Sequence, residues 1–254
     1  MRIVVLGGTG VVGRHVVAAL RASGHEAVVA SRSTGVDLLT GAGLDAALEG
    51  AGAVVDASTV ATSRARTAVE FFTRSAEHVL AAEVRAGVRH HVVVSIVGLE
   101  RVPLGYYAGK LAQERAVLAG PVPVSILRAT QFHEFAGQML DRMAFGPVAA
   151  VPVARVQPVA ARDVGAALAD LALGNPVGRA PEMAGPEVFH LPDLARRTAA
   201  ARGARVRVLP LRLPGAAGRA MAAGALCPDG AFTCGSTPFA QWLAGSGPAV
   251  GAGR

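Results

Sequence analysis

Residues 2–20, RIVVLGGTGVVGRHVVAAL, decide the fold of this chain. The stretch opens with a short apolar run, rich in β-branched residues and closed by glycine, which is typical of a strand buried on both faces. After Gly13 the apolar residues Val16, Val17 and Leu20 recur at helical spacing. The stretch therefore predicts a strand, a glycine-rich turn and a helix.

The glycine turn has the properties of a diphosphate site. Glycine has no Cβ, so an anion can approach the backbone closely, and the first helical turn presents unpaired N–H groups and a favourable dipole. The spacing Gly7-x-x-Gly10-x-x-Gly13 predicts a dinucleotide, whereas no Lys-Ser or Lys-Thr follows to make a P-loop. A glycine turn of another α/β protein is the alternative. The predicted contacts in the turn are Gly7, Thr9, Gly10, Val11, Val12 and Gly13.

The composition limits the class of protein. The 254 residues suffice for one α/β domain, with or without a small appendage, and 52% of them are hydrophobic. No apolar stretch is long enough to cross a bilayer, and the first apolar run is too short for a signal peptide. We therefore expect a cytoplasmic protein that does not bind membranes, as a monomer or homodimer.

The net charge of +7 does not indicate a nucleic-acid partner. The arginines are scattered, aromatic residues are few, and a positive field around an anionic cofactor explains the charge. The two cysteines, Cys227 and Cys234, match no zinc spacing, and we predict no metal site.

The segment after the second predicted strand, residues 25–30, indicates which cofactor binds. An acidic residue there would bind a ribose 2′-hydroxyl and repel a 2′-phosphate. Here Ser31, Arg32 and Ser33 supply a guanidinium and two hydroxyls, which suit a 2′-phosphate. We therefore predict NADP(H) rather than NAD(H), the alternative being a solvent-exposed arginine without a ligand.

Strands and helices alternate along the first half. Helical patterns at residues 44–48 and 64–86 separate apolar runs at 53–58 and 91–95, which predicts an α/β fold with a doubly wound parallel sheet. The carboxyl end of the 53–58 strand should reach the middle of the cofactor. Further predicted cofactor contacts are Asp37, Leu38, Ala57, Ser58 and Thr59.

The segment from Ser95 to Lys110 carries the predicted catalytic residues. Tyr106 and Lys110 lie four apart on a predicted helix, so they share one face, and Lys110 is the only lysine in the chain. A cation beside a phenol favours the phenolate and lowers its pKa, which suits an acid near neutral pH. We expect Tyr106 to donate a proton to a carbonyl oxygen, and Ser95, at a strand end, to donate a hydrogen bond to it.

Two other interpretations of this pair remain. Tyr106 could be a packing residue with Lys110 in solvent, or the pair could bind cofactor without chemistry. In the second case the chain would be an NADP(H)-binding redox sensor or regulator rather than an enzyme.

Together, the glycine turn, Ser95 and Tyr106-x-x-x-Lys110 resemble the short-chain dehydrogenase/reductase superfamily, and within it the atypical NmrA-like branch of NAD(P)H-binding reductases. The resemblance implies a Rossmann domain and a catalytic set of Ser95, Tyr106 and Lys110, with Lys110 also holding the ribose. Gly109 departs from the alanine that is more usual there. By the same resemblance the nicotinamide and substrate wall includes Ala129, Thr130, Gln131 and Phe132, and Pro158 with Asp163-Val164 docks the substrate side.

The second half predicts a small substrate lobe. We divide the chain into a dinucleotide-binding domain, residues 1–150, and a lobe, residues 151–254, packed on it and not independent. Tyr107 and His133 are the predicted substrate contacts, although a histidine such as His133 is more often a pocket-lining or packed residue. The predicted activity is reduction of a carbonyl, quinone or enone of a small hydrophobic molecule by NADPH. An epimerase or dehydratase that retains its cofactor is a further alternative.

Overall fold

The computed structural model describes residues 1–245, which fall into two compact units. The first unit comprises residues 1–129 and 161–182, and the second comprises residues 130–160 and those from 183 onward. The sequence predicted a single boundary at residue 150. The observed division differs in two ways: residues 130–150 belong to the second unit, and residues 161–182 return to the first. The predicted tail from Gly245 falls, beyond that residue, outside the described part of the chain.

The first unit is built on a parallel sheet. Its strands are β1 (Arg2–Leu6), β2 (Glu26–Ala30), β3 (Ala53–Asp56), β4 (His91–Ile96), β5 (Val124–Ala129) and the short β9 (Gly178–Arg179). The order β9-β5-β4-β3-β1-β2 places β1 between β2 and β3, with Val5 opposite both Val29 and Val55. All of these pairings are parallel, and residues 3–6 are fully buried, as the apolar run predicted.

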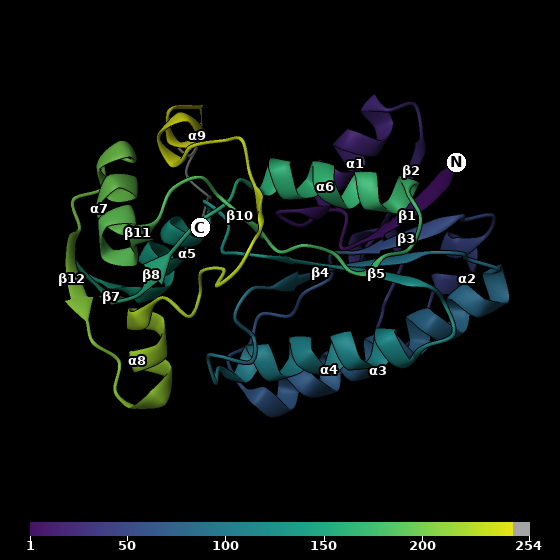
Figure 1. The fold of residues 1–254 in the computed structure, drawn as a ribbon, viewed down its shortest axis with the longest axis horizontal. Coiled ribbons are helices and arrows are strands. Elements are labelled where there is room, and N and C mark those ends of the chain that lie inside the picture. Colours follow the sequence, from purple (N-terminus) through teal and green to yellow (C-terminus); the bar gives the residue numbers. More distant parts are fainter. Residues whose placement is uncertain (246–254) are drawn as a thin grey trace. The chain divides into compact units, whose positions relative to one another are not determined.

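Helices cover both faces of this sheet (Figure 1). On one face lie α1 (Gly13–Ala22) and α6 (Ala161–Leu173); on the other lie α2 (Leu44–Leu48), α3 (Ala65–Ala86) and α4 (Gly105–Ala119). The 3-10 helix η1 (Arg32–Thr34) follows β2. This arrangement confirms the predicted doubly wound parallel sheet.

Glycines let the helices on each face approach closely. A Cβ on Gly165 of α6 would lie 2.6 Å from the Cβ of His15 on α1, so these two helices pack with almost no space between their backbones. On the other face a Cβ on Gly109 of α4 would lie 2.7 Å from the carbonyl carbon of Ala68 on α3. The helix contact therefore explains why glycine replaces the alanine expected at residue 109.

The second unit consists of short strands and helices. They are α5 (Phe135–Met143), β6 (Ala144–Phe145), β7 (Val148–Pro152), β8 (Arg155–Val156), β10 (Met183–Ala184), β11 (Phe189–His190), α7 (Leu191–Ala201), β12 (Arg207–Leu211), α8 (Gly215–Ala223), β13 (Thr233–Cys234) and α9 (Phe239–Gly245). Strand β7 pairs with β12 in parallel and with β6 antiparallel. Strand β8 pairs antiparallel with β11, and β10 pairs in parallel with β13.

Asp163, which the resemblance implies docks the substrate side, lies on α6. The helix begins two residues earlier, at Ala161, so the carboxylate lies in its first turn. An acidic residue there still interacts favourably with the helix dipole.

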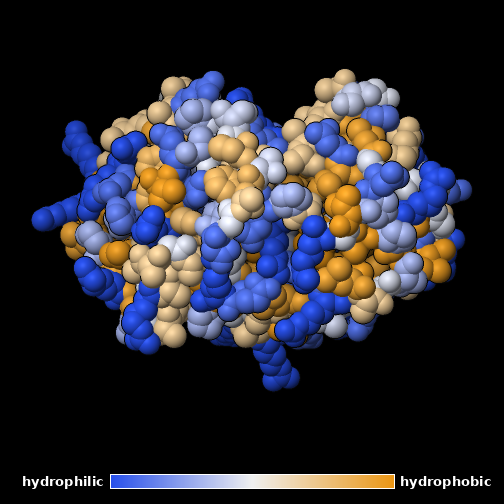
Figure 2. Space-filling view, viewed as in Figure 1, coloured by the Kyte–Doolittle hydropathy of each residue, from blue (hydrophilic) through white to orange (hydrophobic). Residues whose placement is uncertain are grey.

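Hydrophilic and hydrophobic residues are interspersed over the face of the molecule seen in Figure 2. Within residues 1–245, no helix combines the length and the apolar character that crossing a membrane requires.

Candidate functional site

The glycine turn between β1 and α1 is shaped for close backbone packing. A Cβ on Gly13 would lie 2.2 Å from the carbonyl oxygen of Gly7, and one on Gly7 would lie 2.7 Å from the carbonyl oxygen of Ala57. Gly7 also has a φ of +69°, which disfavours any side chain, and it accepts a hydrogen bond of 2.9 Å from the N–H of Gly10. Glycine is thus required at both Gly7 and Gly13.

The start of α1 is open to an anion. Its N-cap, Val12, has no side-chain cap hydrogen bond, and no acidic residue lies in the first helical turn. Thr9 is exposed and Val11 is half-buried, whereas the Val12 side chain is buried in the core. The turn therefore has the backbone groups and helix dipole that suit a diphosphate, and only the backbone of Val12 is available for such a contact.

The end of β2 presents a free guanidinium. Ser31 donates its N–H to the Oγ1 of Thr34 at 2.9 Å, and the hydroxyls of Ser31 and Ser33 lie 2.8 Å apart, which fixes the shape of η1. Arg32 is exposed and makes no ion pair with any residue in the described range. A guanidinium flanked by two hydroxyls fits a phosphate monoester.

Asp37 and Leu38 organise the loop between η1 and α2. The Asp37 carboxylate accepts the N–H of Leu39 at 2.8 Å, and Nδ1 of His78 lies 2.9 Å from the carbonyl oxygen of Leu38. Their role as cofactor contacts remains a prediction.

The segment after β3 holds a buried hydroxyl without a partner. Ala57 donates its N–H to the carbonyl oxygen of Leu6 at 3.0 Å, and Ser58 donates its N–H to the Asp56 carboxylate at 2.8 Å. The Oγ of Ser58 is buried and has no hydrogen-bond partner among the described residues. Because buried hydroxyls are rarely left unpaired, this atom is a candidate contact for a ligand.

Tyr106, at the start of α4, contacts a threonine of this segment. Its phenol oxygen lies 2.7 Å from the Oγ1 of Thr59, and its ring packs edge-on against Phe72 with centroids 5.7 Å apart. Burial raises the pKa of Tyr106, the hydrogen bond with Thr59 acts in the opposite direction, and the negative charge of Asp56 raises it further. The expected lowering of this pKa by a lysine is therefore wrong, and the phenol is protonated at neutral pH.

Lys110 points into the protein, although it lies one turn after Tyr106. Its ammonium donates to the carbonyl oxygen of Val94 at 2.7 Å and to Oε1 of Gln113, and it lies 4.8 Å from the centre of the Phe72 ring. Gln113 in turn donates to Asp56 at 2.8 Å.

Burial lowers the pKa of Lys110 to about 8, although the charges of Asp56 and Glu114 oppose the shift. The ammonium is thus hydrogen-bonded to Val94 and Gln113, and the phenol is hydrogen-bonded to Thr59, although both residues share a helix face. Lys110 is 3% exposed, so the interpretation of a solvated lysine is also wrong.

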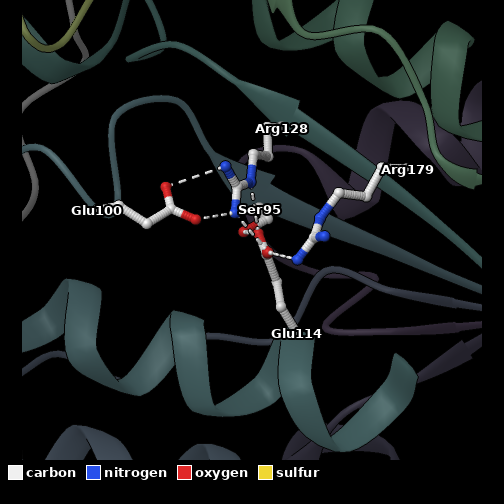
Figure 3. Close-up of polar contacts among 5 residues, drawn as sticks. All are labelled: Ser95, Glu100, Glu114, Arg128 and Arg179. Atoms are coloured by element: carbon white, nitrogen blue, oxygen red, sulfur yellow. Dashed lines mark hydrogen bonds and ion pairs between the residues drawn. The ribbon is translucent and has the colours of Figure 1, made fainter. Parts of the chain in front are cut away.

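Ser95 belongs to an ionic network with Glu114, Arg128, Glu100 and Arg179, of which Ser95 and Glu114 are buried (Figure 3). Its hydroxyl donates to the carboxylate of Glu114, and Ser95 itself is 3% exposed. Arg128 binds that carboxylate through two nitrogens, at 2.9 and 2.7 Å, and binds Glu100 in the same way at 3.1 and 2.6 Å. The expectation that Ser95 donates to a substrate oxygen is not met in this arrangement, because its proton already has a charged acceptor.

The nicotinamide wall implied by the resemblance begins at the end of β5. Ala129 accepts the N–H of Val97 at 3.0 Å within the first unit. In the second unit, Thr130 donates its hydroxyl to the carbonyl oxygen of Gln157 at 2.6 Å. The side-chain amide of Gln131 is buried, and neither its nitrogen nor its oxygen has a partner in the described range. An unpaired amide is a feature that a ligand can complete.

The remaining predicted residues are largely buried. Phe132 forms an isolated parallel bridge with Val159. His133 is 1% exposed, its Nε2 lies 3.0 Å from the carbonyl oxygen of Thr237, and its ring packs against Phe239 and Trp242. Tyr107 is 8% exposed and buried with the apolar core residues. His133 is thus a packed residue, and a substrate role for Tyr107 remains a prediction.

The sequence did not reveal the polar side chains that engage Lys110 and Ser95. Gln113 binds Lys110, Glu114 binds Ser95, and Asp56 accepts a hydrogen bond from Gln113; each of these three is no more than 2% exposed. The one available signal was Asp56, a carboxylate that closes an apolar strand, because a buried charge needs a partner.

Known proteins that are similar to this chain have the same type of fold. The model of the NAD dependent epimerase/dehydratase family matches residues 3–95, and no curated protein matches the chain. The NADPH-dependent quinone oxidoreductase QOR2 of Escherichia coli, complexed with NADPH, is 20% identical with a TM-score of 0.71, covering 96% of this chain and 99% of that one.

Two further solved structures are similar. Triphenylmethane reductase of Citrobacter sp. is 17% identical with a TM-score of 0.67, covering 91% of this chain and 92% of that one. UDP-N-acetylglucosamine 4-epimerase of Bacillus cereus is 18% identical with a TM-score of 0.64, covering 83% and 85%. At sequence identities this low, the similarity shows a shared fold and nothing more. The chain therefore has the Rossmann-type fold of reductases and epimerases, and its residues 3–95 are similar to the NAD dependent epimerase/dehydratase family.

Proposed function

We propose that the chain is an NADPH-dependent oxidoreductase that reduces a carbonyl, quinone or enone of a small hydrophobic molecule. One observation carries the proposal: the partly exposed phenol of Tyr106 meets Thr59 just beyond β3, at the end of the sheet where the glycine turn follows β1. In an open parallel sheet, ligands bind outside the carboxyl ends of the strands.

Several residues fit the cofactor. The glycine turn and the open start of α1 suit the diphosphate, and the unpaired Oγ of Ser58 suits a polar group of the cofactor. The free guanidinium of Arg32 favours NADPH over NADH. When bound, the cofactor supplies a hydride. The motif residues also support placing the chain in the NmrA-like branch.

Tyr106 is the proposed acid. Because burial raises its pKa, the phenol carries its proton at neutral pH and can donate it to a developing oxyanion. That protonation state suits reduction of a carbonyl rather than oxidation of an alcohol. Lys110 and Ser95 support the site indirectly, since both anchor α4 to the sheet through Val94 and Glu114.

The experiment follows the absorbance of NADPH with a panel of quinones, ketones and enones. Tyr106→Phe should lower kcat at least tenfold for any substrate found, because general acid catalysis contributes about 10²–10⁴-fold. The exposed substitution Glu70→Gln on α3 is the matched control. Unchanged turnover in Tyr106→Phe refutes the acid role.

The family match favours a second candidate, an epimerase or dehydratase that retains its cofactor. It predicts product formation without net consumption of NADPH. The engagement of Ser95 with Glu114 favours a third, an NADP(H)-binding sensor, which predicts tight binding and no turnover across the panel.

A further inference from the structure

We infer that Thr59 is the positioning residue of the Tyr106 phenol, in the place where Lys110 and Ser95 were expected. The two side-chain oxygens lie 2.7 Å apart, and the residues are 47 positions apart in the chain. Within residues 1–245, Lys110 and Ser95 make their hydrogen bonds to other groups. The inference rests on the proposed function in one respect only, that Tyr106 acts as the acid.

The backbone around Thr59 is held in place. On one side Ala57 is hydrogen-bonded to Leu6 of β1, and the Asp56 carboxylate accepts the N–H of Ser58. A hydroxyl carried by a fixed backbone can direct its partner more accurately than one on a free loop. Thr59 itself is exposed, so its replacement does not disturb the core.

Of the groups around Tyr106, Thr59 is the one that favours ionisation of the phenol. From α3, the apolar ring of Phe72 packs against the phenol ring, and from β3 the charge of Asp56 opposes a phenolate. On its own helix, the ammonium of Lys110 is bound to Val94 and Gln113. The hydrogen bond with Thr59 lowers the pKa of Tyr106, whereas burial and Asp56 raise it.

The role of Thr59 changes with the state of the phenol. While Tyr106 is protonated, the threonine oxygen can accept its hydrogen and fix the direction of the O–H bond. When the proton moves from the phenol oxygen to a substrate oxygen, the threonine hydroxyl turns and donates to the phenolate. Thr59 keeps its own proton throughout, so it positions the acid without being catalytic.

The test measures ionisation of Tyr106 directly. The chain has two tyrosines, so a Tyr107→Phe background leaves Tyr106 as the only one. Tetranitromethane nitrates the phenolate, and at a fixed mildly alkaline pH the rate follows the ionised fraction. A hydrogen bond to a charged group contributes about 1.5–3 kcal/mol, so Thr59→Val should slow nitration about tenfold or more, and Thr59→Ser should restore it. Circular dichroism checks that each variant is folded.

Equal nitration rates in Thr59→Val and its parent overturn the inference, whether or not a substrate is known. The alternative that Thr59 only contacts cofactor is excluded by the same assay, because no cofactor is present. In turnover, Thr59→Val should lower kcat about tenfold and move its alkaline limb upward. If Tyr106→Phe keeps full turnover but nitration still depends on Thr59, the proposed function fails and the positioning contact stands.

Discussion

Replacing Glu114 by glutamine tests the ionic network that joins α4 to the sheet. The substitution keeps the shape of the side chain and removes its charge. Glu114 is 1% exposed, and it accepts hydrogen bonds from Ser95, from Arg128 at 2.9 and 2.7 Å, and from Arg179 at 3.5 Å. Glutamine cannot accept all of these, and its amide N–H₂ would face a guanidinium.

The expected loss of stability follows from these contacts. Breaking a buried ion pair costs about 3–5 kcal/mol because it leaves one charge without its partner. Arg128 keeps its two bonds to Glu100, whose side chain is 56% exposed, so we expect the lower end of that range, about 3 kcal/mol. For a chain of this size the melting temperature should fall by roughly 6–12 °C.

Urea unfolding at neutral pH measures the difference, with Arg179→Gln as the matched control. Arg179 is 57% exposed and 3.5 Å from the same carboxylate, so its loss should cost less than about 1 kcal/mol. A loss in Glu114→Gln no larger than that in Arg179→Gln would show that the buried bonds of Glu114 to Arg128 and Ser95 do not stabilise the fold.

The difference in unfolding free energy between wild type and Glu114→Gln should change with pH in a definite direction. Burial raises the pKa of Glu114, but hydrogen bonds from Arg128 and Ser95 outweigh it and leave the pKa below its ordinary value of 4.5. The stabilisation is therefore fully present above pH 4.5 and is lost as the pH falls through the lower folded pKa. A wild-type advantage over Glu114→Gln that stays constant into strong acid would contradict the assignment.

Three further outcomes are expected. Gly13→Ala should abolish NADPH binding in a fluorescence titration, because its Cβ would lie 2.2 Å from the carbonyl oxygen of Gly7; retained affinity would exclude the turn as the site. Arg32→Ala should raise the Kd for NADPH roughly tenfold or more and leave that for NADH unchanged, whereas equal effects would remove the 2′-phosphate assignment. Burial lowers the pKa of His91, but Glu83 at 2.7 Å more than offsets this and raises it above 6.5. In urea unfolding the advantage of wild type over Glu83→Gln should thus be largest below pH 6.5 and disappear as the pH rises through the folded pKa.

Local sequence signals predicted the first unit well. The apolar run before Gly7 and the helical spacing after Gly13 are dictated by neighbouring residues, and β1 and α1 follow them. The long helix before Gly87 ends where predicted, because glycine adopts a φ of +70° there. Such features are determined by residues that are close together in the chain, so they can be predicted from a single sequence.

The partners of Ser95 and Lys110 were not predictable in the same way. A hydroxyl or an ammonium takes the best acceptor within reach, and the acceptors here, Glu114 and the carbonyl of Val94, become neighbours only when α4 packs on β4. Likewise, α6 returns to the first unit because Gly165 allows it to pack against His15. Both outcomes depend on tertiary packing rather than on spacing along the chain.

The burial of Lys110 gives the folded protein an unusual chemical property. As the chain has no other lysine, its single side-chain amine lies beneath α4 at 3% exposure, and an acylating reagent can reach it only when that helix separates from the sheet. The acylation rate of this one amine therefore reports how often the helix opens, without any label being introduced.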